Sequence, residues 1–139
     1  MDWKLEVVVA PVADVERARE FYVDRLGFRL DSDYTAGESF RVVQVTPPGS
    51  ACSIVFGTGL GGGQPPGTLK GAQLVVNDIE AAHAFLEERG IENTGPHHFT
   101  ETGQTPGLDP TRRDYGTFVW FDDPDGNTWA LQEVKNPAR

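Results

Sequence analysis

The sequence predicts an α+β fold made of two tandem modules, each with one strand, one helix and three further strands. Strand-like and helix-like periodicities follow one another in the same order twice along the 139 residues. Residues around the two predicted helices also recur at a constant spacing, which indicates an internal duplication. A chain of this length is predicted to form a single domain over residues 1–139, and neither module is expected to be stable alone.

The first module is predicted over residues 4–57. Residues 5–12 are almost continuously apolar and rich in valine, which is typical of a strand covered on both faces. A helix is predicted next, over residues 14–27, with Asp14 as its N-cap. Three further strands, separated by short turn-forming segments, are predicted over residues 28–34, 39–46 and 51–56.

A linker rich in glycine and proline is predicted over residues 58–70, and the second module over residues 71–135. This module begins with a predicted strand over 72–76 and a helix capped by Asp78. Residues 94–116 have no periodicity and are predicted to be a long loop, of the kind that often serves as a lid or binding loop. The last two strands are predicted over residues 117–121 and 128–134.

The duplication is visible when the sequence is shifted by 64 positions, which places Asp14 on Asp78. Both predicted helix caps and both apolar anchors of the helices coincide at this shift. The six identical pairs are Val12 and Val76, Asp14 and Asp78, Glu16 and Glu80, Ala18 and Ala82, Phe21 and Phe85, and Arg25 and Arg89. The two final turns align at Gly49 and Gly126, which requires a larger shift than the 64 positions between the helices. The second module therefore has an insertion, which falls within its predicted loop.

Composition excludes several classes of protein. The formal net charge of −9 argues against a nucleic-acid-binding surface, which requires clustered lysine and arginine. Cys52 is the single cysteine, so a disulfide framework and a multi-cysteine zinc site are excluded. The first residues lack the pattern of a secretory leader, and no apolar run approaches the roughly 20 residues of a membrane span. We therefore expect a cytoplasmic protein that binds neither nucleic acid nor membranes.

The chain resembles the vicinal oxygen chelate superfamily, which includes glyoxalase I, bleomycin-resistance proteins and extradiol dioxygenases. The resemblance covers about residues 4 to 135 and rests on the two repeated modules and three motifs. These motifs are Pro11-Val12-Ala13-Asp14, Phe21-Tyr22 followed by Leu26-Gly27-Phe28, and Phe121-Asp122-Asp123-Pro124-Asp125-Gly126-Asn127-Thr128-Trp129. It implies a cup-shaped, incompletely closed mixed β-barrel with the helices outside, and a small-molecule ligand in a homodimer.

Metal-dependent members of this superfamily place ligands on the first and last strands of each module. The resemblance puts the corresponding positions here at Val7, Ser53, Gly71 and Ala130. These residues do not supply the three or four nitrogen and oxygen donors that a divalent metal needs. Neither a metal nor another cofactor is expected, and this argues against glyoxalase I or extradiol dioxygenase chemistry, in which the ion acts as a Lewis acid.

Strand alternation predicts which side chains face a ligand. The face expected from this alternation is lined by small and apolar residues, two glutamines and a serine. Three aromatic residues on interior strands could also stack on a ligand. The predicted ligand-binding residues are Val7, Val9, Phe40, Ser53, Val55, Gln73, Val75, Phe118, Trp120, Ala130 and Gln132. Such a lining suits a planar or bulky apolar ligand oriented by a few hydrogen bonds. The alternative for the aromatic rings is packing in the core or in a dimer interface.

Four residues of the predicted loop are candidates for catalysis. His97 or His98 could act as a general base, and neighbours in a strand would point to opposite faces, so at most one faces inward. Arg112 and Arg113 could bind a carboxylate or phenolate. The alternative is a solvated loop in which Arg113 pairs with Asp109 or Asp114.

The leading hypothesis is a metal-independent binding protein of the bleomycin-resistance type that sequesters an apolar or aromatic natural product, as in antibiotic resistance. The alternative is a glyoxalase-like enzyme, in the form of a metal-free lyase or isomerase that uses the candidate histidines and arginines. A third possibility is a partner-binding module that has kept the fold and lost the pocket. The superfamily includes enzymes and drug-binding proteins alike, so the fold alone does not decide among these.

Overall fold

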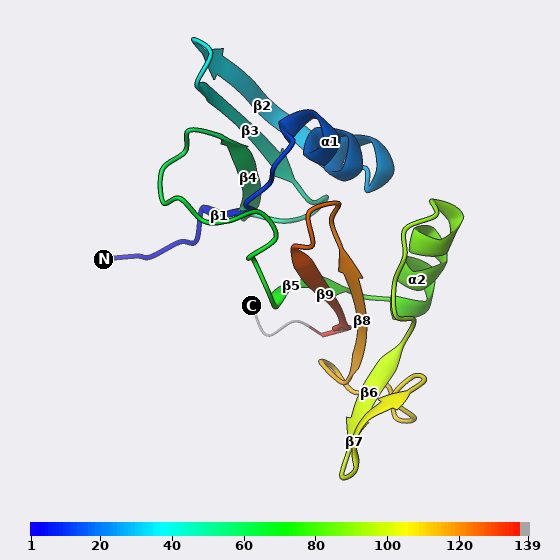
Figure 1. Ribbon diagram of the computed structural model, residues 1–139. Helices are drawn as coiled ribbons and strands as arrows, with labels where there is room; N and C mark the ends of the chain where they lie inside the picture. Colours follow the sequence, from blue (N-terminus) through cyan, green and yellow to red (C-terminus); the bar gives the residue numbers. More distant parts are fainter. Residues whose placement is uncertain (137–139) are drawn as a thin grey trace. The chain divides into compact units, whose positions relative to one another are not determined.

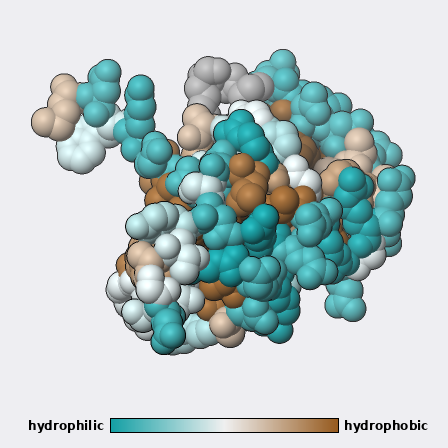
Figure 2. Space-filling model, turned by 90° about the horizontal axis from the view of Figure 1, so that it is seen from above, coloured by the Kyte–Doolittle hydropathy of each residue, from teal (hydrophilic) through white to brown (hydrophobic). Residues whose placement is uncertain are grey.

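The computed structural model describes residues 1–136, so the end of the domain predicted over residues 1–139 lies outside the described residues. The chain divides into two compact units. Unit 1 comprises Met1–Leu69 together with Asp123–Asn127, and unit 2 comprises Lys70–Asp122 and the residues from Thr128 on. Figure 2 shows hydrophilic residues over most of the face that it presents, in agreement with the excess of charged residues.

Unit 1 contains a four-stranded mixed sheet and one helical segment (Figure 1). In chain order its elements are β1 (Val7–Val9), α1 (Val15–Arg19), the π-helix η1 (Glu20–Arg25), β2 (Arg29–Ala36), β3 (Phe40–Thr46) and β4 (Ser53–Thr58). The strand order is β1-β4-β3-β2, with β1 parallel to β4 and the other pairs antiparallel. The strand predicted over residues 5–12 is thus confirmed only for its central part.

Unit 2 repeats this arrangement with one additional strand. Its elements are β5 (Ala72–Val76), α2 (Ile79–Glu88), β6 (His97–Thr100), β7 (Gly103–Pro106), β8 (Thr117–Asp122) and β9 (Thr128–Glu133). The strand order is β5-β9-β8-β6-β7, and β5 is parallel to β9. The first four strands match the order and direction of the sheet in unit 1, as the duplicated sequence predicts. The α+β fold with two tandem modules is confirmed, and neither sheet closes on itself.

The β6–β7 hairpin corrects the prediction of an irregular loop over residues 94–116. Its strands pair in a four-residue antiparallel register, and β6 also pairs with β8. The sequence of this hairpin is rich in threonine and histidine and has one large apolar residue, Phe99, so hydrophobic alternation gives no signal for it. Backbone hydrogen bonds between β6 and the edge of β8 stabilise the hairpin, and the side-chain pattern does not indicate this pairing.

Both helices begin as the sequence predicts. The Asp14 carboxylate accepts a hydrogen bond from the backbone N–H of Arg17, and Asp78 accepts from Glu80 and Ala81. The first helix then widens into the π-helical turns of η1, where the N–H of Leu26 donates to the carbonyl of Phe21. This change brings Tyr22 into the core of unit 1, where its ring stacks on Phe56 with centroids 5.4 Å apart.

The turn over residues 123–127 belongs to unit 1 although it joins β8 and β9 of unit 2. Its Asp123 carboxylate accepts four hydrogen bonds, among them one of 2.7 Å from the buried Tyr22 hydroxyl. The Asn127 side chain donates to the Pro11 carbonyl at 2.8 Å and accepts from the N–H of Leu69 at 3.0 Å. These contacts complete unit 1 with a segment from the second repeat.

No helix among residues 1–136 is both long and apolar enough to cross a membrane.

We predict that Asn127→Ala destabilises the protein. The substitution leaves the Pro11 carbonyl and the Leu69 N–H without the partner that the fully buried amide provides. The expected loss in the free energy of unfolding is about 2–3 kcal/mol, measured by urea denaturation. Asn77→Ala is the matched control, because Asn77 is exposed, and it should change the value by less than about 0.5 kcal/mol. Equal effects of both substitutions would contradict the assigned role of Asn127.

Candidate functional site

Each sheet has one face toward its helix and one face away from it, which we call the open face. In unit 2, the carboxylate of Glu133 accepts a hydrogen bond from the N–H of Ile79 at the start of α2. Glu133 therefore marks the helix side of β9, and Ala130 and Gln132 alternate onto the open face. Cross-strand register extends this face over all five strands of the sheet.

Aromatic side chains gather on the open face of unit 2. The rings of Phe118 and Trp120 are stacked, with centroids 5.3 Å apart and planes 9° apart. Phe99 lies edge-on to both rings, at 5.4 Å from Phe118 and 6.4 Å from Trp120. Phe99 is 50% exposed and the other two rings are partly exposed. We call Phe99, Phe118 and Trp120 the aromatic platform. Phe99 was not among the predicted residues, because its strand was not predicted.

The two candidate histidines point to opposite sides of β6, as their adjacency requires. His97 lies on the open face, edge-on to Trp120 at 6.1 Å. Its Nδ1 is 3.1 Å from the carbonyl of Gly95, which only accepts hydrogen bonds, so Nδ1 is the donor in this contact. His98 is buried on the helix side and donates through Nδ1 to the Gly107 carbonyl at 2.8 Å.

The other predicted residues of unit 2 frame the aromatic platform. Gln132 lies between Phe118 and Val75 in the cross-strand register, and Ala130 lies between Trp120 and Gln73. Gln73 and Val75 are exposed on the edge strand β5, whereas Ala130 and Gln132 are buried. The open face thus presents aromatic rings on one side and the exposed Gln73 on the other, with Gln132 buried on the strand between them.

In unit 1, the predicted residues also share the open face. The Val7–Ser53 and Val9–Val55 pairs lie side by side across β1 and β4, on the face opposite Tyr22 and Phe56. Ser53 and Val55 are buried, and Val9 is 48% exposed. Phe40 lies on the same face of β3 at the far end of the β2–β3 hairpin, 6.3 Å from the ring of Tyr34.

A polar chain that the sequence did not reveal adjoins Ser53. The hydroxyls of Ser53 and Thr46 are 2.6 Å apart, and Thr46 donates to the carboxylate of Asp31. The Thr46 hydrogen bond, followed by that of Arg29, lowers the pKa of Asp31, so this carboxylate is ionised at neutral pH. Because the Thr46 proton goes to Asp31, the Ser53 hydroxyl donates to Thr46 and keeps its lone pairs for a ligand. A register shift in β2 turns Asp31 toward this face, and sequence alternation does not predict such shifts.

The donor chemistry at the four family metal positions does not fit a divalent metal. In unit 1, Val7 pairs with Ser53, so these two positions offer one hydroxyl. In unit 2, Gly71 directly precedes β5, and Ala130 pairs with Gln73, so these two positions offer no side-chain donor. Residues 1–136 contain no group of three His, Cys, Asp or Glu side chains that could hold a metal ion.

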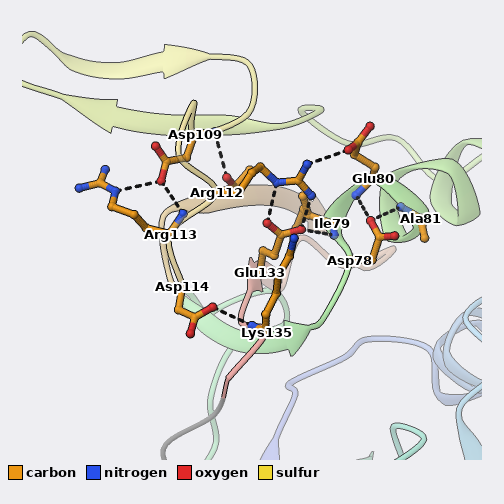
Figure 3. A network of polar contacts seen from close by, with 11 residues as sticks. Asp78, Ile79, Glu80, Ala81, Asp109, Arg112, Arg113, Asp114, Glu133 and Lys135 are labelled. Atoms are coloured by element: carbon orange, nitrogen blue, oxygen red, sulfur yellow. Dashed lines mark hydrogen bonds and ion pairs between the residues drawn. The ribbon is translucent and has the colours of Figure 1, made fainter.

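The two candidate arginines form ion pairs within unit 2 (Figure 3). Arg112 donates to both oxygens of Glu133, at 2.8 and 2.5 Å, and to Glu80 at 2.8 Å. Arg113 pairs with Asp109 at 2.9 Å, which is one of the two pairings that the sequence suggested. Arg112 thereby lies on the α2 side of the sheet, away from the aromatic platform. Its pairing with Glu133 depends on contacts between distant segments, and the sequence did not indicate it.

The fold is that of the glyoxalase and bleomycin-resistance class. The family model described as the glyoxalase/bleomycin resistance protein/dioxygenase superfamily matches residues 4–131. The chain belongs to this superfamily, as its repeated modules indicated.

Three similar proteins illustrate the relationship. TnmS3, an antibiotic binding protein from Streptomyces sp. CB03234, is 32% identical; the match covers 96% of this chain and 97% of TnmS3, with a TM-score of 0.75. A superfamily member from Sphaerobacter thermophilus DSM 20745 is 31% identical over 95% of this chain and 98% of its own, with a TM-score of 0.73. The uncharacterized protein YetH of Bacillus subtilis is 24% identical over 137 residues, which cover 94% of this chain and 98% of YetH.

We predict that Glu133→Gln lowers the free energy of unfolding at pH 7 by about 2–3 kcal/mol, because it removes one charge of a buried ion pair. The hydrogen bonds of Arg112 lower the pKa of Glu133 from 4.5 to about 2. A lowered pKa in the folded state stabilises the protein above about pH 4.5, and this contribution disappears as the pH falls toward 2.

Urea denaturation between pH 2.5 and 7 measures this difference. The gap between the wild type and Glu133→Gln should narrow as the pH falls. Glu101→Gln, at an exposed hairpin position, is the control and should follow the wild type across the range. A gap that stays constant down to pH 2.5 would show that the charge of Glu133 is not what stabilises unit 2.

Proposed function

We propose that the protein binds an apolar or aromatic small molecule on the open face of unit 2, without a metal ion. The aromatic platform is the observation that carries this proposal. Stacked rings that are partly exposed on a sheet face offer a flat apolar surface to a planar ligand, and such contacts add about 0.5–1.5 kcal/mol per ring beyond area burial. An internal packing role would leave Phe99 covered rather than 50% exposed.

Polar groups beside the aromatic platform would orient the ligand. His97, whose Nδ1 donates to the Gly95 carbonyl, lies beside Trp120, and Gln73 is exposed two strands away from Trp120. A few convergent polar groups in an apolar setting are typical of small-molecule sites. The open face of unit 2 therefore suits a planar aromatic ligand that carries a hydroxyl or amide group.

The comparison with TnmS3 supports a natural product as the ligand. TnmS3 is described as an antibiotic binding protein, and the two chains align over nearly their full lengths. We propose that this protein likewise sequesters an antibiotic-like compound and so protects the cell that makes or meets it. The residues at the four family positions support metal independence, because they lack the donors that a metal requires.

The geometry favours binding over the enzymatic alternative. A lyase or isomerase of the kind considered would need a base and an anion-binding arginine on one face. His98 and Arg112 lie on the α2 side, where each has an internal partner, and Arg113 pairs with Asp109. Of the four catalytic candidates, His97 is the one that the structure places on the open face.

We predict that Trp120→Ala weakens the binding of a planar polycyclic aromatic compound at least fivefold, because it removes half of the stacked pair. Titration followed by calorimetry measures the dissociation constant, after a thermal-shift screen of a polycyclic aromatic panel has selected the compound. Phe85→Leu is the control, because Phe85 lies on α2 beneath the guanidinium of Arg89.

Dialysis against EDTA tests metal independence with the same compound. The dissociation constant should stay unchanged after dialysis. Loss of binding that returns with a divalent metal would overturn the metal-independent proposal. Equal affinities of the wild type and Trp120→Ala would overturn the assignment of the ligand to the aromatic platform.

A further inference from the structure

His97 is the basic side chain that the strands of unit 2 present on the open face. The five strands of this unit contain neither lysine nor arginine, and their ionisable residues are His97, His98, Asp122 and Glu133. His98 and Glu133 lie on the helix side of the sheet. On the open face, the strands therefore carry one group that can become positive, His97, and one carboxylate, Asp122, which continues the alternation of the aromatic platform along β8.

The ring of His97 is fixed through one nitrogen and leaves the other available. Nδ1 donates to the Gly95 carbonyl at 3.1 Å, and the ring lies edge-on to Trp120 at 6.1 Å. Because Nδ1 is the donor in this contact, the proton that His97 gains or loses is the one on Nε2. None of residues 1–136 forms a hydrogen bond or an ion pair with Nε2, and His97 is partly exposed. Nε2 is thus open to a ligand beside the aromatic platform.

The neighbouring strands do not compensate a charge on His97. In the cross-strand register His97 lies between Phe118 of β8 and Pro106 of β7, neither of which is ionisable. Asp122 is exposed and lies four positions beyond Phe118, about 13 Å along the strand. Its carboxylate accepts a hydrogen bond from Thr128. The acidic group of the open face is therefore too distant to pair with His97.

The neighbouring helix α2 does not compensate this charge either. A Cβ on Gly95 would lie 3.8 Å from Nε2 of His83, and this nitrogen is 3.3 Å from the carboxylate of Glu87. Glu87 also accepts a hydrogen bond from Asn93 at 2.9 Å. Glu87 is thus engaged by its own neighbours, and no ion pair joins His97 to an acidic side chain of the described chain.

We propose that the ligand is a planar aromatic acid, whose carboxylate or acidic phenol binds Nε2 of His97 while its rings lie on the aromatic platform. This inference rests on the proposed function and names the ligand class for the same site. The ligand oxygen accepts a hydrogen bond from the protonated Nε2. Hydrogen bonds between charged groups are shorter and stronger than neutral ones, and partial burial beside aromatic rings strengthens them further.

The local groups favour an acid over a base. A cationic ligand group would depend on Asp122, and ion pairs at exposed positions contribute little. The net charge of −9 attracts cations over long distances, but salt screens this attraction beyond about 8 Å under physiological conditions. Amide side chains such as Gln73 serve neutral and charged groups alike and do not discriminate. The charge preference of the site is therefore set by His97.

Three anthracene derivatives with a carboxylate, a hydroxymethyl or an aminomethyl group at the same ring position test this preference. They share the rings that stack and differ in charge. At pH 6 the wild type should bind the carboxylate about tenfold more tightly than the alcohol, and the amine more weakly than the alcohol. Dissociation constants are measured by fluorescence titration in buffer of constant ionic strength.

The pH dependence tests whether a proton on His97 is required. Histidine changes its charge near neutral pH, and an aromatic carboxylic acid stays ionised above about pH 5. Binding of the anion favours the protonated ring, so affinity for the carboxylate should rise at least threefold as the pH falls from about 8 to about 6. Affinity for the alcohol should change less than twofold over the same range, because the alcohol carries no charge.

His97→Gln keeps a polar side chain at the site that cannot become charged. It should abolish the pH dependence and weaken binding of the carboxylate at pH 6 about tenfold more than binding of the alcohol. His83→Gln is the matched control, because His83 is a partly exposed histidine on α2, and this variant should retain the pH dependence. The comparison of the three compounds on the wild type depends on neither variant.

The outcomes separate this inference from the proposed function. If the alcohol binds and Trp120→Ala weakens it, while the carboxylate binds no more tightly at any pH, the ligand is not an acid and the aromatic platform stands. A preference for the amine would overturn the inference in the same way. A pH dependence that persists in His97→Gln would overturn the role of His97. Binding of none of the three compounds would overturn both proposals.

Discussion

Glu133 is a carboxylate without solvent exposure, and three separate segments of unit 2 meet at it. It ends β9, caps the backbone at the start of α2 through Ile79, and binds the guanidinium of Arg112 from the segment after the hairpin. A buried charge is costly unless it is paired and hydrogen-bonded. The carboxylate of Glu133 is therefore stable in this position only when all three segments are in place. Its position also fixes which side of β9 faces the helix. The open face with the aromatic platform is therefore a consequence of where Glu133 points.

Much of the fold could be predicted because its signals are local. The capping aspartates, the apolar anchors of the helices and the alternation of the strands each depend on residues close in the sequence. The same alternation placed Gln73, Ala130 and Gln132 on one face. The β6–β7 hairpin was not predicted, because its strands lack the alternation of apolar and polar residues. The polar chain from Ser53 to Asp31 escaped because a register shift in β2 reverses the local alternation.

The aromatic rings and the ion pairs lie on different faces of the protein. In the proposed function, recognition on the open face of unit 2 depends on rings whose mutual packing fixes their orientation before a ligand binds, which limits the entropy lost on binding. The strongly paired charges lie elsewhere, on the helix side and at the surface. Under the proposed function, such a distribution suits a face that stacks against a ligand and orients it.

The turn over residues 123–127 has a consequence for the order in which the protein forms during synthesis. Tyr22 and Pro11 receive their partners Asp123 and Asn127 from residues 101 and 116 positions later in the chain. When the first repeat leaves the ribosome, these partners have not been made. The first repeat therefore lacks these two hydrogen-bond partners until residue 127 has emerged, so unit 1 is completed only after most of the second repeat has been made.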